Sequence, residues 1–106
     1  MVEIIDTAKY REVIKSGNVL IVLGSTWCKD CVKIEPFIKE FKETYAGRVE
    51  IYKIDTRNEE DLSVELNIRA IPTLIFYRDG VEVGVRLVEP QNKELIENAL
   101  KENFSL

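Results

Sequence analysis

The segment 19–23, with the sequence VLIVL, restricts the fold more than any other feature because it has no polar face. A strand that is apolar at every position is covered on both sides, as the strands of parallel sheets are. Helical patterns flank it: Asp6 is a typical N-cap for a helix over 6–15, and a longer helix is expected over 28–45. Strands and helices that alternate in this way favour parallel βαβ crossovers.

The rest of the chain extends this alternation and ends in a hairpin and a closing helix. The expected elements are strands at 2–5, 19–23, 49–54, 73–77 and 81–87 and helices at 6–15, 28–45, 58–67 and 90–104. Asn58 is the expected cap of the third helix, and Asp79-Gly80 is a strong hairpin signal. The face of the last helix that packs on the core is expected to carry Leu95, Ile96, Ala99 and Leu100. The sequence therefore predicts an α/β fold with a mixed five-stranded central sheet flanked by four helices.

Length and charge narrow the class of protein. A chain of 106 residues that is 45% hydrophobic is expected to form one domain over 1–106. The net charge is −4 and basic residues form no cluster, which argues against nucleic acid as a partner. No apolar run is long enough to cross a membrane, and the N-terminal segment MVEIIDTAKYREV carries charges where a signal peptide is apolar. We therefore expect a cytoplasmic protein with no membrane partner.

The two cysteines, Cys28 and Cys31, are the most informative residues for function. A secreted scaffold would carry several dispersed cysteines, and a structural zinc site in one chain would need further Cys or His ligands. The chain has no His. Three interpretations follow: a redox-active pair, a metal site shared between chains, or an incidental pair.

The position of this pair, between a buried strand and a long helix, favours the redox interpretation. The N-terminus of a helix presents unpaired amides and partial positive charge, which stabilise a thiolate at Cys28. Cys31 lies three residues later on the same side of the helix and one turn deeper, where it can attack a mixed disulfide on Cys28. Spacing alone therefore predicts that Cys28 is the nucleophile and Cys31 the resolving thiol.

Four short motifs add a resemblance to a known family. They are W-C-x-x-C at 27–31, a proline at 36, I-P-T at 71–73 and D-G at 79–80. In this combination and order they resemble the thioredoxin family, over essentially the whole chain. The resemblance implies a thioredoxin fold and the activity of a protein disulfide oxidoreductase, with no cofactor beyond the redox-active disulfide Cys28–Cys31.

The resemblance also implies how partners are bound. Trp27 would border the site and pack on the substrate. Ile71 and Pro72 would be joined by a cis peptide bond facing the cysteines, and their backbone would pair with an extended segment of the partner. The implied partners are disulfide-containing proteins and an external electron donor of the thioredoxin-reductase type. The net charge of −4 and the small single core are compatible with a monomer.

The chain departs from the family pattern at several positions. Lys29-Asp30 replaces the usual Gly-Pro between the cysteines. The family's buried Asp aligns with Val22, and the Lys usually opposite it aligns with Ile51. A Gly near the docking site aligns with Val88. A changed proton path and a narrower docking groove are expected.

Glu35 is the sequence's candidate for moving the proton of Cys31, because it lies four residues later and flanks the inward stripe of the helix. A half-buried carboxyl there would have a raised pKa and could act as a general base.

Two alternatives differ from this reading in mechanism. One is a glutaredoxin-like reductase that takes electrons from glutathione or another small thiol. The other is a redox-inert or metal-bridging binding module that uses the groove beside Pro72. Dependence on a small thiol, or a stoichiometry of one metal ion per two chains, would distinguish them.

Overall fold

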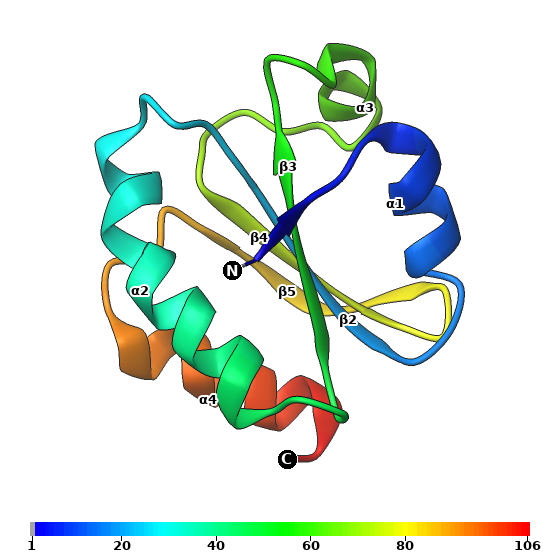
Figure 1. Ribbon diagram of the computed structural model, residues 1–106, viewed down its shortest axis with the longest axis vertical. Coiled ribbons are helices and arrows are strands. Elements are labelled where there is room, and N and C mark those ends of the chain that lie inside the picture. The colour runs from blue at the N-terminus through cyan, green and yellow to red at the C-terminus, as the bar shows by residue number, and fades with distance from the viewer. Residues whose placement is uncertain (1) are drawn as a thin grey trace.

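The computed structural model describes residues 2–106 and has the predicted order of strands and helices (Figure 1). In chain order the elements are β1 (Glu3–Ile4), α1 (Thr7–Val13), β2 (Asn18–Gly24), α2 (Lys29–Thr44), β3 (Glu50–Asp55), α3 (Glu60–Glu65), β4 (Thr73–Arg78), β5 (Val81–Val88) and α4 (Lys93–Phe104). The five-stranded sheet has the order β1-β3-β2-β4-β5. β1, β3 and β2 are parallel, and β4 and β5 run antiparallel to their neighbours. The predicted mixed sheet is confirmed.

The central strand β2 is covered on both faces, as its apolar sequence predicts. Leu20 and Val22 pack into the core beneath α2 and α4, whereas Ile21 and Leu23 pack into the core on the side of α1 and α3. Side chains alternate between the two faces of a strand, so β2 contributes to both cores. Cys28 follows the end of β2 by four residues. This buried strand therefore fixes where the loop that leads to the cysteines leaves the sheet.

The hairpin between β4 and β5 forms where Asp79-Gly80 predicts it. Both residues have positive φ angles, +50° at Asp79 and +88° at Gly80. A two-residue hairpin turn with positive φ at both positions matches the right-handed twist of the strands, which explains why Asp-Gly is favoured there.

Two details of the third and fourth helices differ from the expectation. Asn58 does not cap α3: the Asp55 carboxylate accepts the N–H groups of Arg57 and Asn58 in a turn, and the helix begins only at Glu60. Residue Glu59, at the cap position, is instead bound through its carboxylate by the backbone N–H and hydroxyl of Thr7. A contact between distant segments therefore overrides the local capping preference.

Helix α4 differs from the expectation in its start and in one residue of its inward face. The helix begins at Lys93 rather than near residue 90, and the side chain of Asn92 accepts the N–H of Leu95 as its cap. The buried residues Ile96, Leu100 and Phe104 follow one another at intervals of one turn. Leu95 stands beside this stripe and is 47% exposed, so its assignment to the core was wrong.

Candidate active site

Cys28 and Cys31 come together at the N-terminus of α2. Cys28 is the N-cap of the helix, and its Sγ accepts the backbone N–H of Cys31 at 3.2 Å. Its thiol also donates to the carbonyl oxygen of Ile71, with a separation of 3.6 Å. Cys28 is partly exposed, Cys31 is 7% exposed, and both are free thiols. A helix amide is therefore already aimed at the more accessible sulfur.

Burial has a large effect on the inner thiol. It raises the pKa of Cys31 to about 12, with a further contribution from the hydrogen bond to Cys28, and a hydrogen bond to the Ser25 backbone acts in the opposite direction. Cys31 therefore keeps its proton at neutral pH. A reaction that uses Cys31 as a nucleophile has to remove that proton at the site.

The reduced protein is expected to lose stability above pH 9 because of Cys31. The unfolded thiol titrates near its ordinary pKa of 9.0 and the folded thiol near 12, so the unfolded chain releases a proton that the folded chain retains. The free energy of unfolding then falls as pH rises through this window, by at most about 1.4 kcal/mol per pH unit. Urea unfolding of the reduced protein at pH 8 to 10 would measure the slope.

The control for this measurement is Cys31→Ala. Burial also raises the pKa of Tyr10, Tyr52 and Tyr77, and the hydrogen bond to Glu97 raises that of Tyr45. In the unfolded chain these groups titrate around their ordinary pKa of 10.0, so their effect grows as the pH approaches 10. The variant should lose most of the decline between pH 8 and 9, should show a shallower decline between pH 9 and 10, and should keep the decline at higher pH. Equal slopes in the two proteins would contradict the assignment to Cys31.

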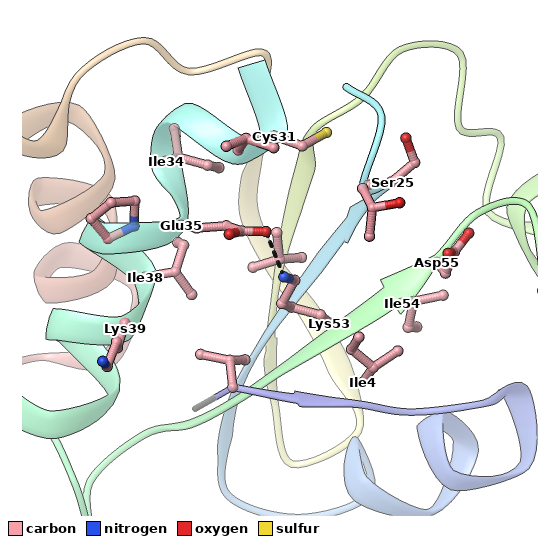
Figure 2. Close-up of a pocket in the computed structure, with 16 residues that line it drawn as sticks. Ile4, Ser25, Cys31, Ile34, Glu35, Ile38, Lys39, Lys53, Ile54 and Asp55 are labelled. Atoms are coloured by element: carbon pink, nitrogen blue, oxygen red, sulfur yellow. Dashed lines mark hydrogen bonds and ion pairs between the residues drawn. The ribbon is translucent and has the colours of Figure 1, made fainter. Parts of the chain in front are cut away.

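A cavity of about 790 Å³ lies behind Cys31, between α2 and the strands β1 and β3 (Figure 2). Gly24 borders it, and a Cβ at that position would lie 2.9 Å from the Sγ of Cys31. The absence of a side chain at Gly24 thus makes room for the inner thiol.

The predicted environment of Glu35 was wrong. Its side chain lines this cavity, but it is 45% exposed and forms an ion pair with Lys53 at 3.0 Å (Figure 2). An exposed, ion-paired carboxyl is not the half-buried group that the sequence argument required. Lys53 of β3, which also lines the cavity, is the partner that the sequence argument did not foresee.

Val22 and Ile51 lie in the same core, beneath α2 and α4. In the parallel pairing of β2 and β3, Val22 lies beside Lys53, whereas Ile51 lies beside Leu20. Lys53 is therefore the β3 residue directly beside Val22, and both residues line the cavity behind Cys31. Ile51 and Lys53 are two residues apart on β3, so their side chains lie on the same face of the sheet.

The loop before β4 faces the outer thiol. Ile71 and Pro72 are joined by a cis peptide bond, and the carbonyl of Ile71 is the group to which Cys28 donates. Pro72 is buried and its carbonyl accepts the N–H of Glu89 at 2.8 Å. Val88 pairs with Thr73 at the end of β5 and is 56% exposed, so an apolar side chain borders this loop.

Trp27 stands out from the surface next to Cys28, with 75% of its area exposed. The guanidinium carbon of Arg57 lies 3.8 Å from the centre of its ring. The sequence analysis did not single out Arg57. The available signal was its place just after β3, because the loops at the carboxyl ends of parallel strands gather at one edge of the sheet.

Within residues 2–106, no helix is long and apolar enough to cross a membrane. No three His, Cys, Asp or Glu side chains of these residues form a group that could hold a metal ion.

Comparison of the sequence with known proteins gives consistent matches. A family model described as Thioredoxin matches residues 1–102. Thioredoxin C-2 of Corynebacterium nephridii is 38% identical over 76 residues, which cover 71% of this chain and 70% of the relative. Thioredoxin Asp f 28 of Aspergillus fumigatus is 33% identical over 88 residues, with 83% and 81% covered.

Solved structures show the same fold. A Plasmodium falciparum thioredoxin superposes with a TM-score of 0.88 at 24% identity, and the match covers 95% of this chain and 98% of the other. A Malassezia sympodialis thioredoxin superposes with a TM-score of 0.86 at 27% identity, covering 96% and 92%. The arrangement of the sheet and its four helices is therefore that of these proteins.

Proposed function

The chain belongs to the thioredoxin family and is a thiol–disulfide oxidoreductase, and we propose that it reduces disulfides of partner proteins with Cys28 as nucleophile and Cys31 as resolving thiol. The observation that carries this assignment of roles is the asymmetry of the pair. Cys28 is accessible and accepts a helix amide, whereas Cys31 is buried behind it. A thiolate is stabilised by such a donor, and attack on a protein disulfide requires access.

The reaction proceeds in two exchanges. The Cys28 thiolate attacks one sulfur of the partner disulfide, a mixed disulfide forms, and the other partner sulfur leaves as a thiolate that takes up a proton. Cys31 then loses its proton and attacks the Sγ of Cys28, which releases the second partner thiol. Two electrons pass from the dithiol to the partner, and Cys28–Cys31 becomes a disulfide.

Partner binding in this proposal uses the surface around the outer thiol. Trp27 offers an exposed aromatic ring, and Ile71, joined to the buried Pro72, offers its backbone and a partly exposed apolar side chain beside Cys28. The bound partner segment is extended and pairs with the backbone at Ile71. The cysteine pair is the whole redox cofactor.

The electron supply in this proposal is external. A reductase of the thioredoxin-reductase type restores the dithiol, and the protein works as a monomer without nucleic acid or membrane. We place it in the cytoplasm, where thiols are kept reduced and a protein reductant can act.

The experiment that tests the donor compares two recycling systems with one disulfide-linked peptide. Turnover is expected with a thioredoxin reductase and NADPH, and at least about tenfold less with glutathione and glutathione reductase, because a CxxC site passes both electrons without a small thiol. Equal or faster turnover with glutathione would favour the glutaredoxin-like alternative. The matched control for both systems is the reaction without this protein.

A further inference from the structure

The cation on Trp27 is the feature of the active-site surface that the two-cysteine reaction leaves unexplained. Arg57 comes from the loop after β3, and its guanidinium lies over the ring of Trp27 at 3.8 Å from the ring centre. Trp27 is the neighbour of the nucleophile, and 75% of its area is exposed. A positive charge is therefore held at the edge of the surface on which a partner disulfide is docked.

Backbone hydrogen bonds fix the loop that carries Arg57. The N–H of Arg57 donates to the Asp55 carboxylate at 2.8 Å, and the N–H of the preceding residue, Thr56, donates to the carbonyl of Gly24 at 3.0 Å. Gly24 ends the strand that leads to the cysteines. The position of the cation is thus built into the fold at the same place as the thiols.

The charge of Arg57 remains available to a partner. No carboxylate within residues 2–106 forms an ion pair with it. A contact between a guanidinium and an aromatic ring does not use up its N–H donors, which can still bind a carboxylate in a forked geometry. The contact with Trp27 therefore leaves Arg57 able to bind a carboxylate of a partner.

Two other exposed cations stand in the segments that meet at this site. Lys29 follows Cys28, and Arg69 lies two residues before Ile71, whose carbonyl accepts from Cys28. The chain as a whole carries a net charge of −4. The same segments also hold five carboxylates, at Asp30, Asp55, Glu59, Glu60 and Asp61, so they carry no net excess of positive charge. Among these charged residues, Arg57 is the one in contact with the aromatic ring of Trp27.

We propose that Arg57, held on Trp27, makes this protein prefer partner disulfides flanked by Asp or Glu in an extended segment. This inference rests on the proposed function, because it concerns the partner of the same site. An aromatic or aliphatic side chain of the partner packs on Trp27. A carboxylate beside the partner cysteine binds the N–H groups of the Arg57 guanidinium. Complementary charge of this kind changes selectivity and association rate more than the chemical step.

The test uses two disulfide-linked peptides that differ only in their flanking residues, Asp in one and Lys in the other. With the full-length protein, kcat/KM is expected to favour the acidic peptide. Arg57→Met should lower kcat/KM for the acidic peptide by about threefold to fivefold, as expected for an exposed ion pair. The loss should appear in KM, with kcat and the Lys-flanked peptide little changed, and added salt should reduce the preference of the wild type.

The chain offers a matched control in Arg48, whose guanidinium carbon lies 5.3 Å from the centre of the Tyr45 ring, just after α2 and far along the chain from Cys28. Arg48→Met removes the same charge and the same kind of contact and should leave kcat/KM for both peptides unchanged.

Equal losses of kcat/KM on both peptides in Arg57→Met would overturn the proposal, since an effect of Arg57 on the position of Trp27 would not depend on the flanking charge. So would a preference in the wild type for the Lys-flanked peptide. Absence of turnover with either peptide would instead refute the proposed function.

Discussion

Replacing Cys28 by serine is expected to abolish disulfide reduction, and replacing Cys31 by serine is expected to stop the reaction after its first exchange. Loss of the nucleophile removes the only covalent route, so turnover should fall by roughly 10³-fold or more. The Cys31→Ser variant keeps an accessible Cys28 at the helix N-terminus. It also keeps the hydrogen bond to the Cys28 sulfur, because the donor is the backbone N–H of residue 31. It should therefore accumulate a mixed disulfide with the partner peptide.

Mass spectrometry of the intact protein after mixing with a disulfide-linked peptide measures this trapping. One peptide per protein is expected on Cys31→Ser, at Cys28 after peptide mapping. Little adduct is expected on Cys28→Ser, because its remaining thiol is 7% exposed and keeps its proton at neutral pH. The double variant is the control for non-covalent carry-over. A stable adduct on Cys31 in the Cys28→Ser protein would reverse the assigned roles.

The second large effect is expected at Gly24. An added Cβ would lie 2.9 Å from the Sγ of Cys31, so in Gly24→Ala the inner thiol has to move. Overpacking of this kind costs about 1–3 kcal/mol. If that cost falls on the step in which Cys31 attacks, the step slows by roughly 5-fold to 150-fold. The first exchange should change little, because the added Cβ contacts only Cys31 and not the nucleophile Cys28.

Stopped-flow mixing with excess reduced protein separates the two steps for Gly24→Ala. Release of the first partner thiol should keep the wild-type rate, and release of the second should be slow. Gly17→Ala is the matched control: its φ of +78° makes alanine strained, but no atom lies within 4 Å of the added Cβ. It should lower stability by about 1 kcal/mol without changing either step. Wild-type rates for both steps in Gly24→Ala would contradict the account of the inner thiol.

The order of strands and helices was predictable because each element carries its own local signal. β2 has an uninterrupted apolar run, α2 has an apolar stripe, and the hairpin has Asp79-Gly80. These signals act within a few residues and agree with the packing. They fail where distant segments intervene, as at Glu59, whose carboxylate is held by Thr7. The prediction for Leu95 failed for a related reason. Leu95 lies at the edge of the inward stripe of α4, and whether such a residue is buried depends on the neighbouring elements and not on the helical pattern alone.

The candidate site divides in the same way. The cysteine pair and the Ile71–Pro72 bond could be predicted, because they belong to short motifs. The surroundings of the inner thiol could not, since they depend on strand register and on a side chain from another element. Lys53 reaches Glu35 across the cavity, and its place beside Val22 follows from the pairing of β2 with β3. Arg57 meets Trp27 only because two loops at one edge of the sheet converge.

The central claim is that Cys28 and Cys31 form a reversible two-electron couple that serves as a reductant. A redox titration followed by the fluorescence of Trp27, the neighbour of Cys28, tests it most directly, with defined dithiol/disulfide buffers. The account predicts one reversible two-electron transition at about −230 mV or lower, within reach of cytosolic donors, and its loss in Cys31→Ser. A transition near −180 mV or above would indicate an oxidant or isomerase, and the absence of any transition would contradict the account.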